Sequence, residues 1–133
     1  MASSYHALKQ GEQELTTLVC VTGQHQEMVV QVLTFFDIQP DIDLNLMKKW
    51  QDLFDITYLV LLGMRVVFQQ QRPDLILLHG DTSTSSAASI DGFYVGLTVG
   101  HEAAELRTHN IRSPFTKEFS WRVRSLDDIR TRL

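Results

Sequence analysis

The sequence predicts an α/β fold, a Rossmann-like, doubly wound parallel sheet built by a chain of 133 residues. Three observations predict it: short apolar runs rich in β-branched residues, segments of helical apolar spacing between these runs, and turn residues where the runs end. Strands that alternate with helices are typical of βαβ units, because parallel strands need a crossover that is usually a helix. The length fits one domain with one core, spanning residues 1–133.

The first predicted elements are a strand, a helix and a weaker second strand. Leu18 to Thr22 is a continuously apolar run that ends at Gly23, the pattern of a strand buried on both faces. From Glu27 to Phe36 the apolar positions recur at helical spacing, and a turn around Pro40 follows. Ile42 to Leu46 is predicted to be the next strand.

The longest helical pattern runs from Asp52 to Gln71, where apolar residues form one stripe and Asp52 can occupy the first turn. A buried strand is predicted at Leu75 to His79, after Pro73. Thr84 to Tyr94 carries enough Ala and Ser to be a helix packed closely on a sheet. A third strand is predicted at Leu97 to Gly100, and Ser125 to Arg132 is predicted to form a last helix.

Composition and charge favour a globular protein without a nucleic-acid partner. The net charge is −4, and 44% of the residues are hydrophobic. The basic residues gather towards the C-terminus, but only Phe115, Phe119 and Trp121 lie among them, so a solvated basic face explains them better than a nucleic-acid site.

The sequence predicts a cytoplasmic protein without a membrane partner. Cys20 is alone, which excludes an intrachain disulfide and a Cys-rich zinc site. The longest apolar run, Tyr58 to Met64, is far shorter than the roughly 20 residues of a membrane-spanning helix. The first residues also lack the apolar core of a signal peptide.

Candidate functional residues follow the predicted strands, where a parallel sheet places its active site. Asp81 stands just before a helix whose dipole favours its ionised form, so it can act as a base, bind hydroxyls, or simply cap the helix. His25 and His101 can bind phosphate or shuttle protons, or they can be hydrogen-bonded loop histidines. A metal on His79, His101 and Glu102 is not expected, because their spacing matches no defined site.

Five blocks of sequence resemble successive motifs of the non-hydrolysing UDP-N-acetylglucosamine 2-epimerases. They are VTGQHQEM (21–28), DIDLNLM (41–47), PDLILLHGDTSTS (73–85), VGHEAAELRT (99–108) and NIRSPF (110–115). The resemblance implies the N-terminal lobe of a two-lobed GT-B fold that binds UDP-sugar between its lobes. It implies interconversion of UDP-GlcNAc and UDP-ManNAc, for polysaccharide synthesis, by elimination and re-addition of UDP, with carboxylates as acid and base and no metal or nicotinamide cofactor.

The same resemblance implies the site residues. The implied catalytic carboxylates are Asp81, Glu102 and Glu118, and the implied substrate- or effector-binding residues are Gln24, His25, His101, Arg107 and Thr108. Ala103 and Lys117 stand where the family has acidic residues, and the family's opening strand and second lobe have no counterpart here.

These departures lead to the expectation that this chain alone does not turn over substrate. Residues 116–133 are expected to be a diverged tail. The expected partners are a UDP-sugar and either a second copy of the chain or a full-length epimerase on which it docks. The alternative reading is a non-catalytic module for sugar-nucleotide binding or epimerase docking.

Overall fold

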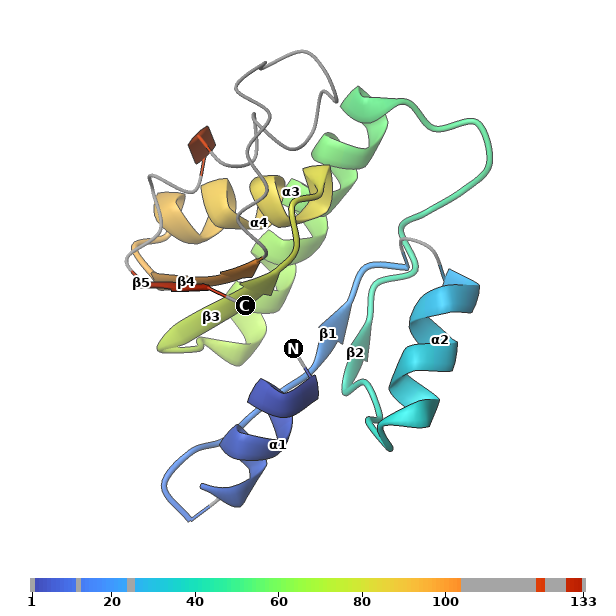
Figure 1. Ribbon diagram of the computed structural model, residues 1–133. Helices are drawn as coiled ribbons and strands as arrows, with labels where there is room; N and C mark the ends of the chain where they lie inside the picture. The colour runs from blue at the N-terminus through green and yellow to red at the C-terminus, as the bar shows by residue number, and fades with distance from the viewer. Residues whose placement is uncertain (1, 12, 24–25, 104–121, 124–128, 133) are drawn as a thin grey trace. The chain divides into compact units, whose positions relative to one another are not determined.

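The computed structural model describes residues 2–11, 13–23, 26–103, 122–123 and 129–132 (Figure 1). Its contacts divide the chain into two compact units, Met1–Lys49 and Trp50–Leu133. All strand pairs in the described part are parallel, and they form one sheet in each unit. The expectation that residues 1–133 form a single domain stays a prediction.

The first unit has a short parallel pair of strands between helices. Its described elements are α1 (Ala2–Gln10), β1 (Cys20–Val21), α2 (Gln26–Phe35) and β2 (Ile42–Asp43). Cys20 lies opposite Ile42, and backbone hydrogen bonds extend the pairing from Val19 as far as Leu46. Both predicted strands and the predicted helix are therefore confirmed in place, although the regular ladder is shorter than predicted. Among the described residues of this unit, Ile38 is the one buried apolar side chain, with 7% of its surface exposed.

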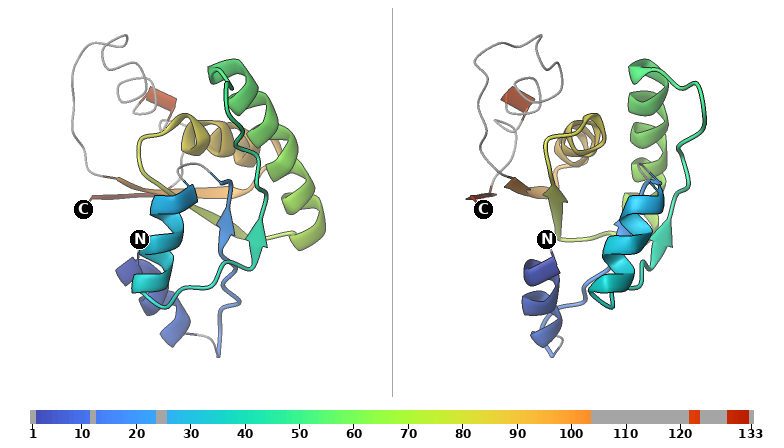
Figure 2. Two further views of the ribbon diagram at one scale, coloured as in Figure 1. Left: turned by 90° about the vertical axis from the view of Figure 1, so that its right-hand side faces the viewer. Right: turned by 45° about the vertical axis from the view of Figure 1, so that its right-hand side comes forward.

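The second unit contains most of the buried apolar side chains. Its described elements include α3 (Leu53–Gln71), β3 (Leu75–His79), α4 (Ser83–Tyr94), β4 (Thr98–Ala103) and β5 (Ile129–Arg132). The strand order is β3-β4-β5, with Leu75 opposite Thr98 and His79 opposite Glu102. Helix α4 lies on one face of this sheet, and α3 packs against α4 and crosses it at a large angle (Figure 2).

The predicted C-terminal helix is wrong where the structure describes it. Residues 129–132 form strand β5, which pairs with β4 so that Gly100 faces Ile129 and Ala103 faces Arg132. The outer edge of β4 offers backbone groups that need partners, and Ile129 and Thr131 are β-branched residues that favour a strand. A short, highly charged segment without an apolar stripe gains less from forming a helix. Of the predicted helix, residues 125–128 lie outside the described part of the chain.

Helix α3 begins and ends where its capping residues predict. The Asp52 carboxylate accepts hydrogen bonds from the backbone of Phe54 (2.8 Å) and Asp55 (3.0 Å), and the Asp55 carboxylate accepts from the Asp52 backbone (3.1 Å), which completes a capping box. At the other end, Arg72 adopts a left-handed conformation (φ 46°), and its N–H donates to the Phe68 carbonyl. This confirms the predicted start and end.

By length and composition, α3 is also apolar enough to cross a membrane: it has 19 residues, and the mean hydropathy of an 18-residue window within it is 1.2. Core helices of globular proteins pass the same test. One face of α3, formed by Val60, Met64, Val67 and Phe68, is buried in the second unit, where α3 packs against α4; 22% of its apolar window is buried in all.

Helix α4 approaches the sheet closely because its inner face is small. Ser86, Ala87, Ala88 and Ser89 are each at most 4% exposed. A Cβ atom added at Gly92 would lie 2.9 Å from the Val99 side chain, closer than real Cβ contacts. The prediction of a small-residue helix packed on the sheet is therefore confirmed.

Candidate functional site

The carboxyl ends of β3 and β4 bring the candidate residues of the second unit together. In the parallel register, Leu78 faces His101 and His79 faces Glu102. The turn after β3 carries Asp81 and leads directly into α4. In parallel α/β folds, ligands bind at this end of the strands.

The turn that precedes Asp81 is fixed to β4 through both backbone groups of Gly80. The Gly80 N–H donates to the Glu102 carbonyl over 3.0 Å, and the Gly80 carbonyl oxygen lies 2.8 Å from His101 Nε2. Gly80 has a φ of 82°, a conformation that costs other residues about 1–2 kcal/mol. The glycine of the HGD sequence is thus required by the turn itself.

The start of α4 is held by hydroxyl groups. Thr82 is the N-cap, and its Oγ1 accepts a hydrogen bond from the Ser85 backbone (3.2 Å). The Ser85 hydroxyl donates to the His79 carbonyl (2.7 Å), and the Ser86 hydroxyl donates to the Thr82 carbonyl (3.1 Å). The sequence left open whether Asp81 caps this helix. In the structure the N-cap is Thr82.

Asp81 is half-buried beside this helix start. The exposed N–H groups of a helix N-terminus favour negative charge, whether on a carboxylate or on a phosphate ligand. Partial burial lowers the pKa of the neighbouring His79, an effect that the carboxylate of Glu102 opposes and the ring of His101 reinforces. At neutral pH the His79 imidazole is therefore mainly uncharged.

The structure places some of the predicted residues and not others. His101 and Glu102 are 1% and 5% exposed, and they lie beside the Asp81 turn. The remaining predicted residues lie outside the described part of the chain; they are Gln24, His25, Arg107, Thr108 and Glu118. Within the described ranges, no group of three His, Cys, Asp or Glu side chains is arranged to hold a metal ion.

Two contributors to the site were not singled out from the sequence. The first is Ser85, whose hydroxyl on α4 donates a hydrogen bond to the carbonyl at the end of β3. The second is Gly80, whose carbonyl oxygen is hydrogen-bonded to His101 Nε2. The hydroxyl-rich stretch from Thr82 to Ser89 could have pointed to Ser85, but it indicated only that a hydroxyl group caps the helix. Nothing local indicated the second, because His101 is 21 residues away in sequence.

Cys20 in the first unit does not offer a nucleophile. Burial raises the pKa of its thiol to about 11, and the nearby Asp43 carboxylate adds to this effect. The thiolate, which is the reactive form, is therefore scarce at neutral pH.

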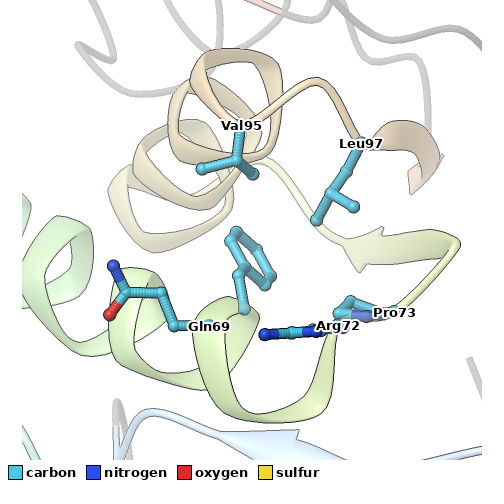
Figure 3. Close-up of a pocket in the computed structure, with 6 residues that line it drawn as sticks. Gln69, Arg72, Pro73, Val95 and Leu97 are labelled. Atoms are coloured by element: carbon cyan, nitrogen blue, oxygen red, sulfur yellow. The ribbon is translucent and has the colours of Figure 1, made fainter.

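A shallow pocket of about 320 Å³ lies elsewhere in the second unit (Figure 3). It is lined by Phe68, Gln69, Arg72, Pro73, Val95 and Leu97. Pro73 and Leu97 precede β3 and β4, so this pocket is at the amino ends of the strands. It is not part of the site around Asp81.

The fold and the strand-end residues define a class of protein, a parallel α/β lobe with its polar groups at the carboxyl ends of the strands. The family model described as UDP-N-acetylglucosamine 2-epimerase matches residues 6–125. The chain belongs to this family.

Individual relatives agree with this assignment. A UDP-N-acetylglucosamine 2-epimerase of Yersinia pestis is 48% identical over 118 residues, covering 89% of this chain and 31% of the relative. The crystal structure of Neisseria meningitidis UDP-GlcNAc 2-epimerase bound to UDP-GlcNAc superposes with a TM-score of 0.86 at 41% identity, covering 96% of this chain and 35% of that one. S. aureus MnaA, solved with UDP, gives 0.90 at 39% identity, with 99% and 35% covered.

The chain spans about a third of the length of these relatives. Its fold is that of the N-terminal lobe of a GT-B epimerase, as the sequence predicted. The family to which it belongs is a family of isomerases that act on a nucleotide sugar.

Proposed function

We propose that this chain is the first lobe of a UDP-N-acetylglucosamine 2-epimerase, which contributes Asp81 as a catalytic carboxylate and does not turn over substrate by itself. The observation that carries the proposal is the Asp81 turn, held on β4 through Gly80 and placed at the start of α4. Such a turn presents a carboxylate and a helix N-terminus to one ligand. Relatives solved with UDP-GlcNAc or UDP support a UDP-sugar as that ligand.

The proposed roles follow the residue types. A carboxylate can remove or return a proton at carbon, as the interconversion of UDP-GlcNAc and UDP-ManNAc requires. Asp81 is proposed for this role together with Glu102 and Glu118, and Arg107 is proposed to pair with the diphosphate. Gln24, His25 and Thr108 are proposed to line the same ligand site. The His101 ring, which the resemblance also implied as a binding residue, is only 1% exposed and is not proposed as a ligand contact.

Proton NMR of UDP-GlcNAc incubated with the chain tests the catalytic part of the proposal. We expect no UDP-ManNAc from the chain alone, because a positioned carboxylate contributes about 10²–10⁴-fold in rate and the matched acidic position holds Ala103. An intact family member is the positive control. UDP-ManNAc formed by the chain and abolished by Asp81→Asn would contradict the expected inactivity and establish a complete site.

Titration of UDP into labelled chain tests the binding part. We expect shifts at residues 22–25, 80–84 and 101–108, with a dissociation constant of about 1 mM, weakened several-fold by Arg107→Ala. An absence of shifts at 10 mM UDP, about ten times that constant, would remove the nucleotide site from this chain and leave a scaffold remnant.

A row of exposed apolar side chains on α3 favours the second candidate function, docking on another epimerase lobe. Phe54, Tyr58, Leu62 and Val66 follow one another at intervals of four residues, which places them along one side of the helix, and they are 39–84% exposed. A second copy of the chain or a full-length epimerase is the proposed partner. A cytoplasmic location is proposed with it.

Sedimentation equilibrium tests the docking candidate. We expect self-association that Tyr58→Lys weakens at least tenfold, because the change places a charge in the apolar row. Gln71→Lys adds the same charge at the exposed end of α3, off this row, and is expected to leave association unchanged. A wild-type chain that stays monomeric and forms no complex with an intact epimerase would contradict the candidate.

A further inference from the structure

The His101 ring is almost completely enclosed beside the Asp81 turn. It is 1% exposed, and it is among the largest fully buried side chains in the described structure. Its Nε2 atom lies 2.8 Å from the Gly80 carbonyl oxygen. A carbonyl oxygen only accepts hydrogen bonds, so Nε2 must carry the proton and donate it.

The acceptor belongs to the peptide that leads into Asp81. The Gly80 carbonyl and the Asp81 N–H share one planar unit, so an anchored carbonyl oxygen also fixes the plane from which the Asp81 Cα extends. The Gly80 N–H is held by the Glu102 carbonyl on the other side of the residue. Gly80 is thus bonded to β4 at both ends.

These two hydrogen bonds matter because Gly80 has few other contacts that restrict its backbone conformation. It occupies a left-handed conformation (φ 82°), and apart from Gly80 and its two chain neighbours no residue has a heavy atom within 4 Å of the place where a Cβ would be. Glycine reaches many conformations at little cost. Without side-chain packing around it, its orientation depends on its hydrogen bonds.

We infer that His101 is a positioning residue for Asp81: it holds the Gly80 peptide through Nε2 and so sets the direction of the Asp81 carboxylate. The ring is too enclosed to be an exposed ligand group, and it acts on the site through the backbone. The effect of His101 on UDP binding rests on the proposed function, whereas its effect on the conformation of the Gly80–Asp81 turn does not.

Two nearly isosteric substitutions separate the hydrogen bond from the packing. His101→Gln keeps an N–H donor of similar reach, and His101→Met keeps similar bulk without a donor. Backbone hydrogen exchange is measured in the chain carrying each change. We expect His101→Met to lower the protection of the Gly80 amide by about tenfold relative to that of Val99 in β4, the scale of one lost hydrogen bond with its partner left unmatched, and His101→Gln to restore most of it.

A purely structural role for the ring predicts a different pattern. Exchange would then rise at Gly80 and Val99 alike in both variants, and Gln would rescue nothing; either result overturns the inference. UDP titration supplies a separate readout, in which the Met variant loses the shifts at residues 80–84 and the Gln variant recovers them. If the wild-type chain binds no UDP, the proposed function fails, while the exchange pattern still decides the role of His101.

Discussion

Replacing Phe68 by alanine is expected to lower the free energy of unfolding of the second unit by about 3 kcal/mol. Phe68 is 6% exposed on the last turns of α3, where it lines the pocket together with Val95 and Leu97. Removing the ring loses its burial and leaves a cavity next to an existing hollow. The loss is a large part of the roughly 5–15 kcal/mol that stabilises a typical domain.

Urea unfolding and a thermal scan measure this loss. For a unit of this size, about 3 kcal/mol corresponds to a fall in Tm of roughly 12–24 °C. Phe93→Ala is the matched control, because Phe93 is 54% exposed on α4; its loss is expected to stay below about 1 kcal/mol. Equal losses from the two changes would mean that the end of α3 does not belong to the core.

Asp91→Asn is expected to raise the free energy of unfolding by about 1–2 kcal/mol at pH 7–8. Asp91 lies on α4, is 5% exposed, and its Oδ2 atom is buried without a hydrogen-bond partner among the described residues. Burial raises the pKa of Asp91, and the charge of Arg65 on α3 opposes this in part. The ionised form is therefore less favourable in the folded chain than in the unfolded one.

The sign of the pH dependence follows from the raised pKa. Between the ordinary carboxyl pKa and the raised one, the folded chain binds more protons than the unfolded chain, so the contribution of Asp91 to stability falls as pH rises through this interval. The difference between wild type and Asp91→Asn should then be small near pH 4 and grow towards neutrality. Asp74→Asn, which makes the same change at an exposed site, is the control. If the difference in the free energy of unfolding between wild type and Asp91→Asn did not change with pH, the result would contradict the burial of a charged Asp91.

Elements whose signals are local could be predicted from the sequence. Strand β3 was predicted at Leu75–His79 and lies there, because an apolar run between Pro73 and Gly80 marks both of its ends. Helix α3 carries its own capping box at Asp52. Strand β5 was predicted as a helix, because what stabilises it is the free edge of β4, and a partner distant in sequence leaves no mark on the local pattern.

The candidate site divides in the same way. Asp81 could be predicted, since a polar residue directly after a buried strand falls at the ligand end of a parallel sheet. The enclosure of His101 and its bond to Gly80 could not, because they depend on the parallel register of β3 and β4. The orphaned carboxylate of Asp91 was also missed, since one acidic residue on a helix ordinarily faces water.

The close approach of α4 to the sheet limits how this chain can change during evolution. Ser86, Ala87, Ala88 and Ser89 are each at most 4% exposed, and a Cβ atom added at Gly92 would lie 2.9 Å from the Val99 side chain of the sheet. A library of substitutions should therefore accept only Gly, Ala and Ser at these positions. Phe93 and Tyr94, which are more than half exposed on the same helix, should vary widely. Changes in α4 are thus expected at its exposed positions, whereas its buried positions are expected to keep small side chains.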